Sequence, residues 1–257
     1  MQRFTGKQFV VTGGASGIGL GIAQRLVEEG GHVLLLDRDS ARLAEAAAQL
    51  GRADRLEVDL GDAAAVVAAA QEVADRLGTV DGLVNNAGIG DASVDPWQLT
   101  VEQWDRVYAV NVRAPFQLIQ RLSQAMTAGG SIVNISSGMA KRAGSGVAYC
   151  SSKAAVLGLT QVWAGPLGAR GIRINAVCPG IIDTPIYHPV DRAMGQPPGS
   201  FVHQILRSMQ APAALQIALP RVGLPRDIAG VVAFLLSEDA AYVTGQSLVV
   251  DGGFLYD

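Results

Sequence analysis

Tyr149 and Lys153 stand four residues apart in the segment Tyr-Cys-Ser-Ser-Lys, and this pair is the strongest candidate for chemistry in the chain. Residues at this spacing on a helix lie on one face, one turn apart. A phenol ordinarily loses its proton at about pH 10. Because a neighbouring ammonium stabilises the phenolate, the pair predicts a tyrosine with a lowered pKa that acts as a general acid or base near neutral pH.

Two serines, Ser136 and Ser137, follow an apolar run that predicts a strand over residues 131–135. Ligands bind in the crevice outside the carboxyl ends of parallel strands, so a hydroxyl there can hold a substrate oxygen against Tyr149. Capping of a turn is the alternative role for both serines.

A glycine-rich segment joins an apolar run over residues 9–11 to a helical pattern over residues 18–29. Glycine lets the backbone approach a phosphate closely, and a helix N-terminus offers free N–H groups to the same anion. The segment predicts a dinucleotide site, although its spacing departs from G-x-G-x-x-G. The residues expected to form it are Gly13, Ser16, Gly17, Ile18 and Gly19.

Asp37 ends the second apolar run, where an acidic side chain accepts hydrogen bonds from the adenosine ribose. Its charge repels a 2′-phosphate and favours NAD over NADP, whereas the adjacent Arg38 can pair with that phosphate and keeps the alternative open. Asp59 and Leu60 follow the third apolar run and are expected at the adenine end. Asp59 is predicted either to bind the adenine amino group or to cap a helix.

Alternating strands and helices must position these residues. The predicted strands cover residues 9–11, 33–36, 55–58, 83–84, 131–135, 172–177 and 247–250. The predicted helices cover residues 18–29, 42–50, 63–77, 101–126, 147–170 and 226–236. The alternation predicts an α/β fold, a doubly wound parallel sheet with helices on both faces.

No internal repeat or linker appears, which favours a single domain over residues 1–257. An irregular insertion over about residues 183–225 contains two short helical patches and is predicted to be a lid over the substrate, with a disordered loop as the alternative. The candidate pocket favours an apolar or cyclic secondary alcohol, and sugars and polyols stay open. Its residues, besides Ser137 and Tyr149, are Met139, Val147, Tyr187, Met194 and Phe201.

Composition argues against several kinds of partner. The net charge is −3 with no basic block, which disfavours nucleic acid, and no run of about 18 apolar residues predicts a membrane span. Cys150 and Cys178 match no metal spacing and no disulfide framework, so no metal site is predicted. Free thiols and the lack of a signal-peptide pattern predict a cytoplasmic protein.

Taken together, five segments resemble the short-chain dehydrogenase/reductase family over essentially the whole chain. They are TGGASGIG at Thr12–Gly19, NNAG at Asn85–Gly88, NISS at Asn134–Ser137, YCSSK at Tyr149–Lys153 and NAVCPG at Asn175–Gly180. The resemblance implies a Rossmann-type sheet of seven strands and hydride transfer between nicotinamide and a secondary alcohol or ketone. It also implies a homotetramer, with the C-terminal segment Ser247–Tyr256 at an interface.

The resemblance further implies a role for each matched residue. Tyr149 is the general acid/base, Lys153 lowers its pKa and holds the nicotinamide ribose, and Ser137 orients the substrate oxygen. Asn111 holds a water that links Lys153 to solvent. Asn86, Ala87 and Gly88 either line the cofactor cleft or support the glycine loop. The remaining implied cofactor contacts are Pro179, Gly180, Ile182 and Thr184.

Two departures from the family pattern bear on these roles. Ser136 lies thirteen positions before Tyr149, the usual family spacing, but the NISS motif points to Ser137. Ser137 is preferred because a loop shortens more easily than a strand slips. NADP-preferring members often carry a basic residue at the position of Ser16. This chain has serine there, which agrees with a preference for NAD. The alternatives are a 3-oxoacyl thioester reductase of the same family, a non-redox lyase, or a nucleotide-sensing protein; the complete glycine, serine, tyrosine and lysine set argues against the last two.

Overall fold

The computed structural model describes residues 2–91, 95–141, 146–187, 191, 195, 197–200, 202, 204, 218–219 and 221–254. Seven strands form one sheet in the order β3-β2-β1-β4-β5-β6-β7, and every neighbouring pair is parallel. All seven predicted strands are confirmed, with ends moved by at most two residues. Their bounds are Gln8–Thr12 (β1), His32–Asp37 (β2), Ala53–Glu57 (β3), Gly82–Asn85 (β4), Ser131–Ile135 (β5), Arg173–Pro179 (β6) and Ser247–Val250 (β7).

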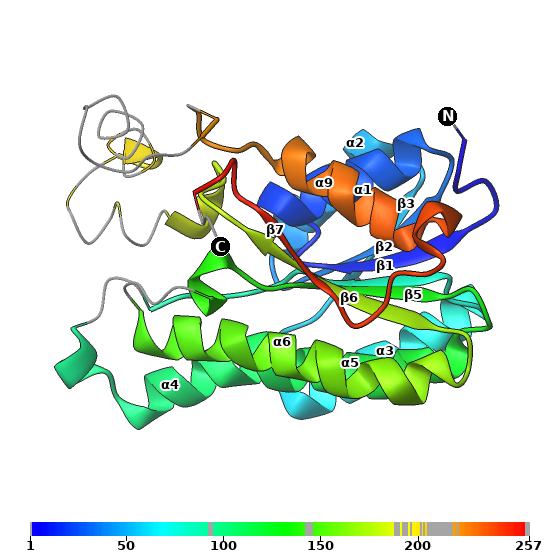
Figure 1. The fold of residues 1–257 in the computed structure, drawn as a ribbon, viewed down its shortest axis with the longest axis horizontal. Helices are drawn as coiled ribbons and strands as arrows, with labels where there is room; N and C mark the ends of the chain where they lie inside the picture. The colour runs from blue at the N-terminus through cyan, green and yellow to red at the C-terminus, as the bar shows by residue number, and fades with distance from the viewer. Residues whose placement is uncertain are drawn as a thin grey trace.

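Helices cover both faces of the sheet, which confirms the doubly wound architecture (Figure 1). One layer holds α1 (Gly17–Glu28), α2 (Ser40–Leu50) and α9 (Pro225–Leu236). The opposite layer holds α3 (Ala63–Leu77), α4 (Val101–Tyr108), α5 (Ala114–Leu122) and α6 (Val147–Gly168). Short 3-10 turns lie at Pro96–Gln98, Ser123–Ala125, Gly138–Ala140, Pro185–Tyr187 and Glu238–Ala240.

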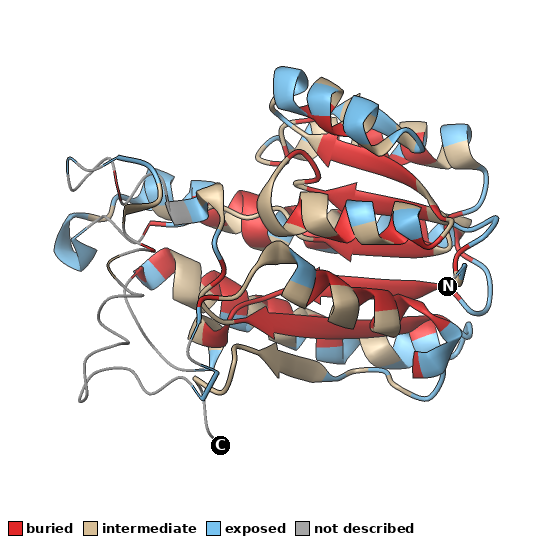
Figure 2. Ribbon diagram, turned by 90° about the horizontal axis from the view of Figure 1, so that it is seen from above, coloured by how far each residue is buried: buried red, intermediate tan, exposed pale blue. Residues whose placement is uncertain are grey.

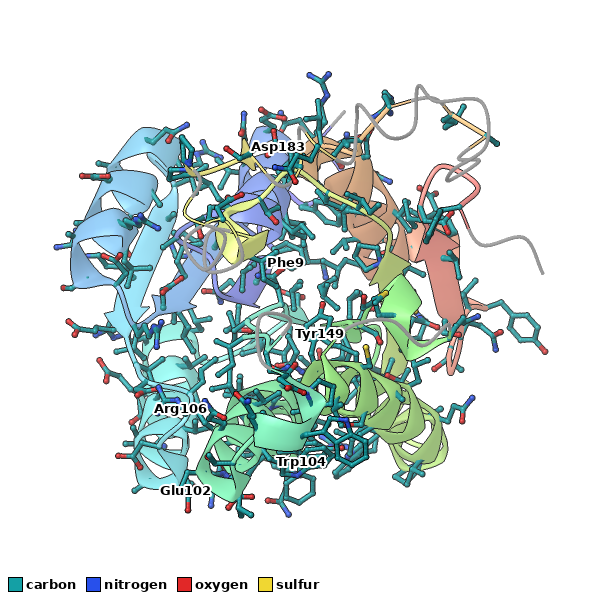
Figure 3. All side chains as sticks on the ribbon, turned by 90° about the vertical axis from the view of Figure 1, so that its left-hand side faces the viewer. Phe9, Glu102, Trp104, Arg106, Tyr149 and Asp183 are labelled. Carbon is teal, nitrogen blue, oxygen red and sulfur yellow. The ribbon has the colours of Figure 1, made fainter. Side chains whose placement is uncertain are left out.

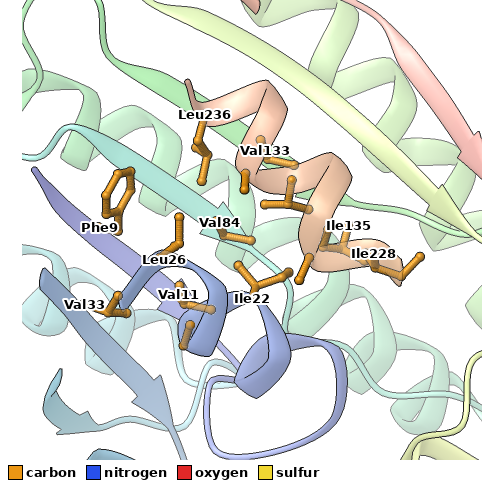
Figure 4. Close-up of a cluster of buried hydrophobic side chains, with 14 of the residues drawn as sticks. Phe9, Val11, Ile22, Leu26, Val33, Val84, Val133, Ile135, Ile228 and Leu236 are labelled. Carbon is orange, nitrogen blue, oxygen red and sulfur yellow. The ribbon is translucent and has the colours of Figure 1, made fainter. Parts of the chain in front are cut away.

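The central strands are buried on both faces, and Figure 2 shows the burial running through the sheet. Successive side chains of a strand point to opposite faces, so Val10 and Val11 enter different cores. Val11 packs with Ile22 and Ile228 beneath the α1–α9 layer (Figure 4). Val10 packs with Leu118 beneath the other layer. Continuous apolar runs are therefore what these strands require.

The strand order reverses at β1, which pairs with β2 on one side and β4 on the other. At such a reversal, open α/β sheets generally bind ligands in a crevice outside the carboxyl ends of the strands. The glycine-rich segment follows β1, and the Asn86–Gly88 segment follows β4. The topology therefore brings two distant predicted motifs to one crevice.

The helix predicted over residues 101–126 is helical throughout most of its length but is not one α-helix. Residues Ala109–Arg113 form a π-helical turn between α4 and α5, and Ser123–Ala125 forms a 3-10 turn. A π turn accommodates one more residue than an α turn, and such turns often mark functional sites. Apolar periodicity did not reveal it, because one extra residue shifts the pattern too little.

Only parts of the predicted lid at 183–225 lie within the described residues. A parallel bridge pairs Ile182 with Gly223, so the two ends of the segment lie together. Met194 and Phe201 lie outside the described residues, as do most of the two helical patches predicted around 201–209 and 211–219.

Candidate active site

Helix α6 carries Tyr149 and Lys153 on one face, as their spacing predicts. The Lys153 Nζ atom lies 5.8 Å from the centroid of the Tyr149 ring. Lys153 is buried, and its Nζ donates a hydrogen bond to the carbonyl oxygen of Ile135, 2.8 Å away at the end of β5. Figure 3 looks onto the carboxyl ends of the strands and has Tyr149 near the middle of that face. The pair therefore stands beside the crevice.

The two adjacent serines have different partners. The Ser137 side chain lies close enough to Tyr149 to lower the pKa of the phenol, and its oxygen accepts the N–H of Met139 at 3.1 Å. The Ser136 hydroxyl instead donates to the carbonyl oxygen of Lys153 at 2.7 Å. The geometry thus brings Ser137, the serine that the NISS motif indicated, to Tyr149. Ser136 fastens β5 to α6.

The electrostatics of the pair differ from the sequence expectation. Burial raises the pKa of Tyr149, and the nearby Ser137 side chain opposes this only in part. Burial also lowers the pKa of Lys153 to about 8, because a charged amine loses its hydration there. The expected fall in the Tyr149 pKa is therefore wrong for the protein alone, because desolvation of the phenolate outweighs the other effects. The Lys153 amine has a lowered pKa of its own and is already hydrogen-bonded to the Ile135 carbonyl.

Asn111 lies in the π turn, and its side chain holds the segment after β4. Its Nδ2 donates to the Ile89 carbonyl at 2.9 Å and to Ser152 Oγ at 3.0 Å, while its Oδ1 accepts the Ile89 N–H at 2.9 Å. Ser152 Oγ in turn donates to the Tyr149 carbonyl at 2.7 Å. A Cβ on Gly88 would lie 3.1 Å from Lys153 Nζ and 3.4 Å from Asn111 Oδ1. Asn111 and Lys153 therefore flank the Gly88 backbone.

The glycine loop has the features of a phosphate site. Gly13 and Gly17 adopt φ values of 63° and 54°, and a Cβ on Gly19 would lie 2.1 Å from the Gly13 carbonyl oxygen. Ser16, the N-cap of α1, makes no side-chain hydrogen bond to the first turn, which includes Ile18 and carries no acidic residue. Asp39 and Asp62 do cap α2 and α3. The unsatisfied N–H groups of α1 suit the phosphates of a dinucleotide.

The segment after β4 supports that loop. Asn86 Nδ2 donates to the carbonyl oxygens of Thr12 and Gly13 at 2.9 and 3.2 Å. Thr12 Oγ1 accepts the N–H groups of Asn86 and Ala87 at 2.9 and 3.0 Å. Of the two roles predicted for this segment, the Asn86 side chain takes the supporting one. Sequence reasoning missed Thr12, whose partners lie more than seventy positions away.

Asp37 ties the end of β2 to the glycine loop. Its Oδ2 accepts the Ala15 N–H at 3.2 Å, and its Oδ1 accepts the N–H groups of Arg38 and Asp39 at 2.7 and 3.2 Å. Asp37 is half-buried, whereas Arg38 is exposed. The carboxylate therefore stands beside the loop, where the sequence predicts the adenosine ribose.

Asp59 does not cap a helix, so that alternative is wrong: the N-cap of α3 is Asp62. Asp59 Oδ1 accepts the Gly61 N–H at 2.8 Å, and Oδ2 lies 3.0 Å from Nη2 of Arg106 on α4. The hydrogen bond from Gly61, followed by that from Arg106, lowers the pKa of Asp59. Its neighbour Leu60 is buried in the core. The role toward adenine remains a prediction.

The contacts predicted after β6 are split between core and crevice. Pro179 ends β6, and a Cβ on Gly180 would lie 2.7 Å from Asp251 Cα, so Gly180 permits a close approach to the segment after β7. Ile182 is buried in the core, whereas a Cβ on Gly17 would lie 3.3 Å from the Thr184 side chain. Thr184 thus lies beside the glycine loop, and its hydroxyl donates a hydrogen bond to the carbonyl oxygen of the buried Ile182 at 3.3 Å.

The pocket candidates within the described residues lie on either side of Tyr149 in the sequence. Met139 is half-buried in the 3-10 turn after β5, and Val147, the first residue of α6, is 45% exposed. Tyr187 ends the turn after Thr184. Asp91 was missed entirely: its carboxylate accepts two N–H groups at the start of α6. Nothing adjacent in the sequence could reveal partners 57 and 58 positions away.

Two kinds of feature are absent from the described part of the chain. No group of three or more histidine, cysteine, aspartate and glutamate side chains there could hold a metal ion. None of the described helices has both the length and the apolar character that crossing a membrane requires.

Comparison with known proteins places the chain in a family. The family model described as enoyl-(acyl carrier protein) reductase matches residues 13–255. Galactitol 2-dehydrogenase of Agrobacterium fabrum is 36% identical, with 98% of each chain covered. L-2,3-butanediol dehydrogenase of Corynebacterium glutamicum is 37% identical, covering 98% of this chain and 99% of the relative.

A solved structure agrees with these relatives in fold. The short-chain dehydrogenase of Burkholderia cenocepacia J2315 in complex with NADP superposes with a TM-score of 0.86 and 35% identity, covering 98% of this chain and 99% of that one. The match spans the glycine loop, the sheet and α6. The chain therefore belongs to the short-chain dehydrogenase/reductase family and is an oxidoreductase with that family's Rossmann-type, nicotinamide-binding fold.

Proposed function

We propose that this oxidoreductase uses NAD(H) to interconvert a secondary alcohol and its ketone, with Tyr149 as the general acid/base. The observation that carries the proposal is the position of buried Lys153, one helical turn from Tyr149 and with its Nζ 5.8 Å from the ring centroid. Ser137 also lies close enough to Tyr149 to lower the pKa of the phenol. All three side chains lie near the carboxyl end of β5, at the same end of the sheet as the uncapped N-terminus of α1.

The nicotinamide, when bound, supplies the acceptor or donor of the hydride. In alcohol oxidation, the Tyr149 oxygen takes the hydroxyl proton, and Ser137 donates a hydrogen bond that orients the substrate oxygen. Burial keeps Tyr149 protonated in the protein alone, so the centre needs added positive charge to ionise it at neutral pH. Lys153 in its charged form would supply part of that charge, and its Nζ would bind a ribose hydroxyl. Asn111 would hold a water that links Lys153 to solvent.

The preference for NAD rests on Asp37 and Ser16. The Asp37 carboxylate beside the glycine loop would accept the ribose hydroxyls and repel a 2′-phosphate. Ser16 supplies no positive charge to that phosphate. The Burkholderia protein was solved with NADP, which concerns the cofactor of that protein. An assay with both cofactors tests the preference of this chain.

The substrate belongs to the class of neutral secondary alcohols. Met139 and Val147 would line the substrate pocket beside Tyr149 with apolar surface. The segment 183–225, which holds Tyr187, Met194 and Phe201, would close over the substrate as a lid of a single domain. The named activities of two relatives, on galactitol and on 2,3-butanediol, add polyols and vicinal diols to the candidates. A 3-oxoacyl thioester reductase is the second candidate, favoured by the description of the family model.

A homotetramer in the cytoplasm completes the proposal. Strand β7 lies at the edge of the sheet and has no partner on its outer side among the described strands. On α6, Val162 is 75% exposed, and the nearby Gly158 and Gly165 have open space where a Cβ would stand. An exposed apolar face of this kind suits a second copy of the chain. Light scattering coupled to gel filtration tests the assembly.

The proposed reaction is tested by following the absorbance of the reduced nicotinamide. Purified protein is assayed with NAD and separately with NADP, against 2,3-butanediol, galactitol, cyclohexanol and a 3-oxoacyl thioester run in the reductive direction. Turnover of an alcohol with NAD as the better cofactor is expected. Activity confined to the thioester with NADPH would favour the second candidate, and no turnover of any of them would count against the proposal.

A further inference from the structure

Helix α6 begins without a cap of its own. Its N-cap residue is Gly146, at φ 92° and with no side chain to accept a hydrogen bond from the first turn. This helix has 22 residues and carries both Tyr149 and Lys153. Uncapped N–H groups leave the first turn of a helix free to fray. Tyr149 lies in that first turn.

The missing cap comes from another part of the chain. Asp91 is 6% exposed, and its Oδ2 accepts the Ala148 N–H at 2.8 Å while its Oδ1 accepts the Tyr149 N–H at 3.0 Å. Both carboxylate oxygens are therefore used, one on each amide. A buried carboxylate at a helix N-terminus also meets the positive end of the helix dipole.

The segment that carries Asp91 is itself held in place. Asn111 binds both the N–H and the carbonyl of Ile89, two residues earlier. A Cβ on Gly90 would lie 3.7 Å from Cδ2 of Tyr149, so the segment runs along the tyrosine ring. The N–H of Tyr149 is bound by Asp91, and its carbonyl by Ser152, which Asn111 also binds. The Tyr149 N–H is therefore held directly by the segment after β4, and the Tyr149 carbonyl is linked to that segment through Ser152 and Asn111.

We infer that Asp91 is a positioning residue, which fixes the backbone of Tyr149 against the cofactor-facing segment Gly88–Gly90 and so sets the distance between the phenol and the reacting atoms. The inference rests on the proposed function, because only a reacting Tyr149 makes that distance matter. Displacing a catalytic group by about 1 Å can lower a rate by about 100-fold. Removing the carboxylate should therefore act on turnover more than on binding of the dinucleotide.

The test compares Asp91→Asn with the matched control Asp62→Asn. Asp62 also accepts two N–H groups with its carboxylate, at 2.8 and 3.2 Å, but it caps α3, which carries none of the proposed catalytic residues. We expect Asp91→Asn to lower kcat about 10- to 100-fold with the KM for NAD within about twofold of wild type. Asp62→Asn should keep kcat within about twofold.

Equal kcat values for Asp91→Asn and wild type would overturn the inference, and so would an equal fall in both variants. Asp91→Asn retains one acceptor oxygen, whereas Asp91→Ala retains none and should lose at least as much rate. Asp91→Ala replaces Asp91→Asn if that variant does not fold. Wild-type turnover is measured in the same assay, so an inactive wild type marks a failure of the proposed function and not of the positioning role.

Amide hydrogen exchange on the wild-type protein tests the contact without any activity. The amides of Ala148 and Tyr149 should exchange at least about tenfold more slowly than those of the uncapped first turn of α1 at Ile18 and Gly19. Equal exchange in the two turns would show that Asp91 does not hold α6, and it would overturn the inference even if neither variant could be purified.

Discussion

The glycine loop after β1 and the Tyr149 centre on α6 are built in opposite ways. The loop depends on side chains that are absent: Gly13, Gly17 and Gly19 allow the backbone to fold on itself. The centre depends on polar side chains that reach it from separate segments. Ser137 comes from the end of β5, Asn111 from the π turn and Asp91 from the segment after β4.

The two sites therefore differ in how they are encoded in the sequence. The glycines of the loop lie within eight consecutive residues, and Asn86 and Asp37 hold it from elsewhere in the chain by the hydrogen bonds described above. The centre is specified by hydrogen bonds between residues 22 to 58 positions apart. Substitutions in the loop should therefore act on the dinucleotide, and substitutions in the centre should act on turnover.

Tyr149→Phe should have the largest effect, because it removes only the transferable proton from the centre. We expect kcat to fall about 10⁴-fold, while the Kd for NAD measured by calorimetry changes little. Tyr242→Phe is the control, since Tyr242 is fully exposed and lies outside the site. A Tyr149→Phe enzyme that kept even a tenth of the wild-type rate would remove Tyr149 from the mechanism.

Ser137→Ala should come next. It deletes the hydroxyl that lowers the Tyr149 pKa and that is proposed to orient the substrate, so kcat should fall about 100-fold with little change in Tm. Ser136→Ala deletes the bond to the Lys153 carbonyl, and a loss of about 1–2 kcal/mol of stability with a smaller loss of rate is expected. The reverse order of the two kcat values would assign the substrate to Ser136.

The sequence was enough to predict the features that are local or periodic. The seven strands, both helix layers and the meeting of Tyr149 with Lys153 all follow from apolar runs and from one turn of helix. The choice of Ser137 over Ser136 followed from the NISS motif of the resembled family, because a loop is shortened more easily than a strand is shifted in register.

What the sequence could not predict depends on contacts across the fold. The π turn around Asn111 differs from an α turn by a single residue, and the partners of Thr12 and Asp91 are far away in the chain. The direction of the Tyr149 pKa was wrong for the same reason. Charge proximity is visible in the spacing, but the burial that outweighs it exists only once the sheet and α6 have packed.

Asp37→Ala tests the loop side of the comparison. Loss of the carboxylate should raise the KM for NAD about tenfold and relax the rejection of NADP, because both the ribose acceptor and the charge opposing a 2′-phosphate are gone. The kcat with saturating NAD should stay near wild type. Asp54→Ala, an exposed carboxylate on β3, is the control. An unchanged ratio of the two cofactors would show that Asp37 only ties β2 to the loop.

Lys153→Met tests the stability of the centre, where the expected change in the free energy of unfolding is small. Burial lowers the pKa of Lys153 from 10.5 to about 8, so between these values the unfolded chain binds more protons than the folded one and folding grows more favourable as the pH rises. At pH 7 the buried amine therefore opposes folding by about 3 kcal/mol. Methionine removes that penalty but leaves the Ile135 carbonyl without its donor, which offsets about 1–2 kcal/mol.

The Lys153→Met variant should thus unfold in urea with about 1–2 kcal/mol more stability than wild type at pH 7, and the advantage should vanish by about pH 10. Lys141→Met, at an exposed lysine, should show no such trend. A difference that stayed constant from pH 7 to pH 10 would mean that Lys153 keeps its ordinary pKa. The buried Lys153 charge would then cost the protein no stability. The expected trend means instead that the charged amine beside Tyr149 lowers the free energy of unfolding, because its burial disfavours the folded state.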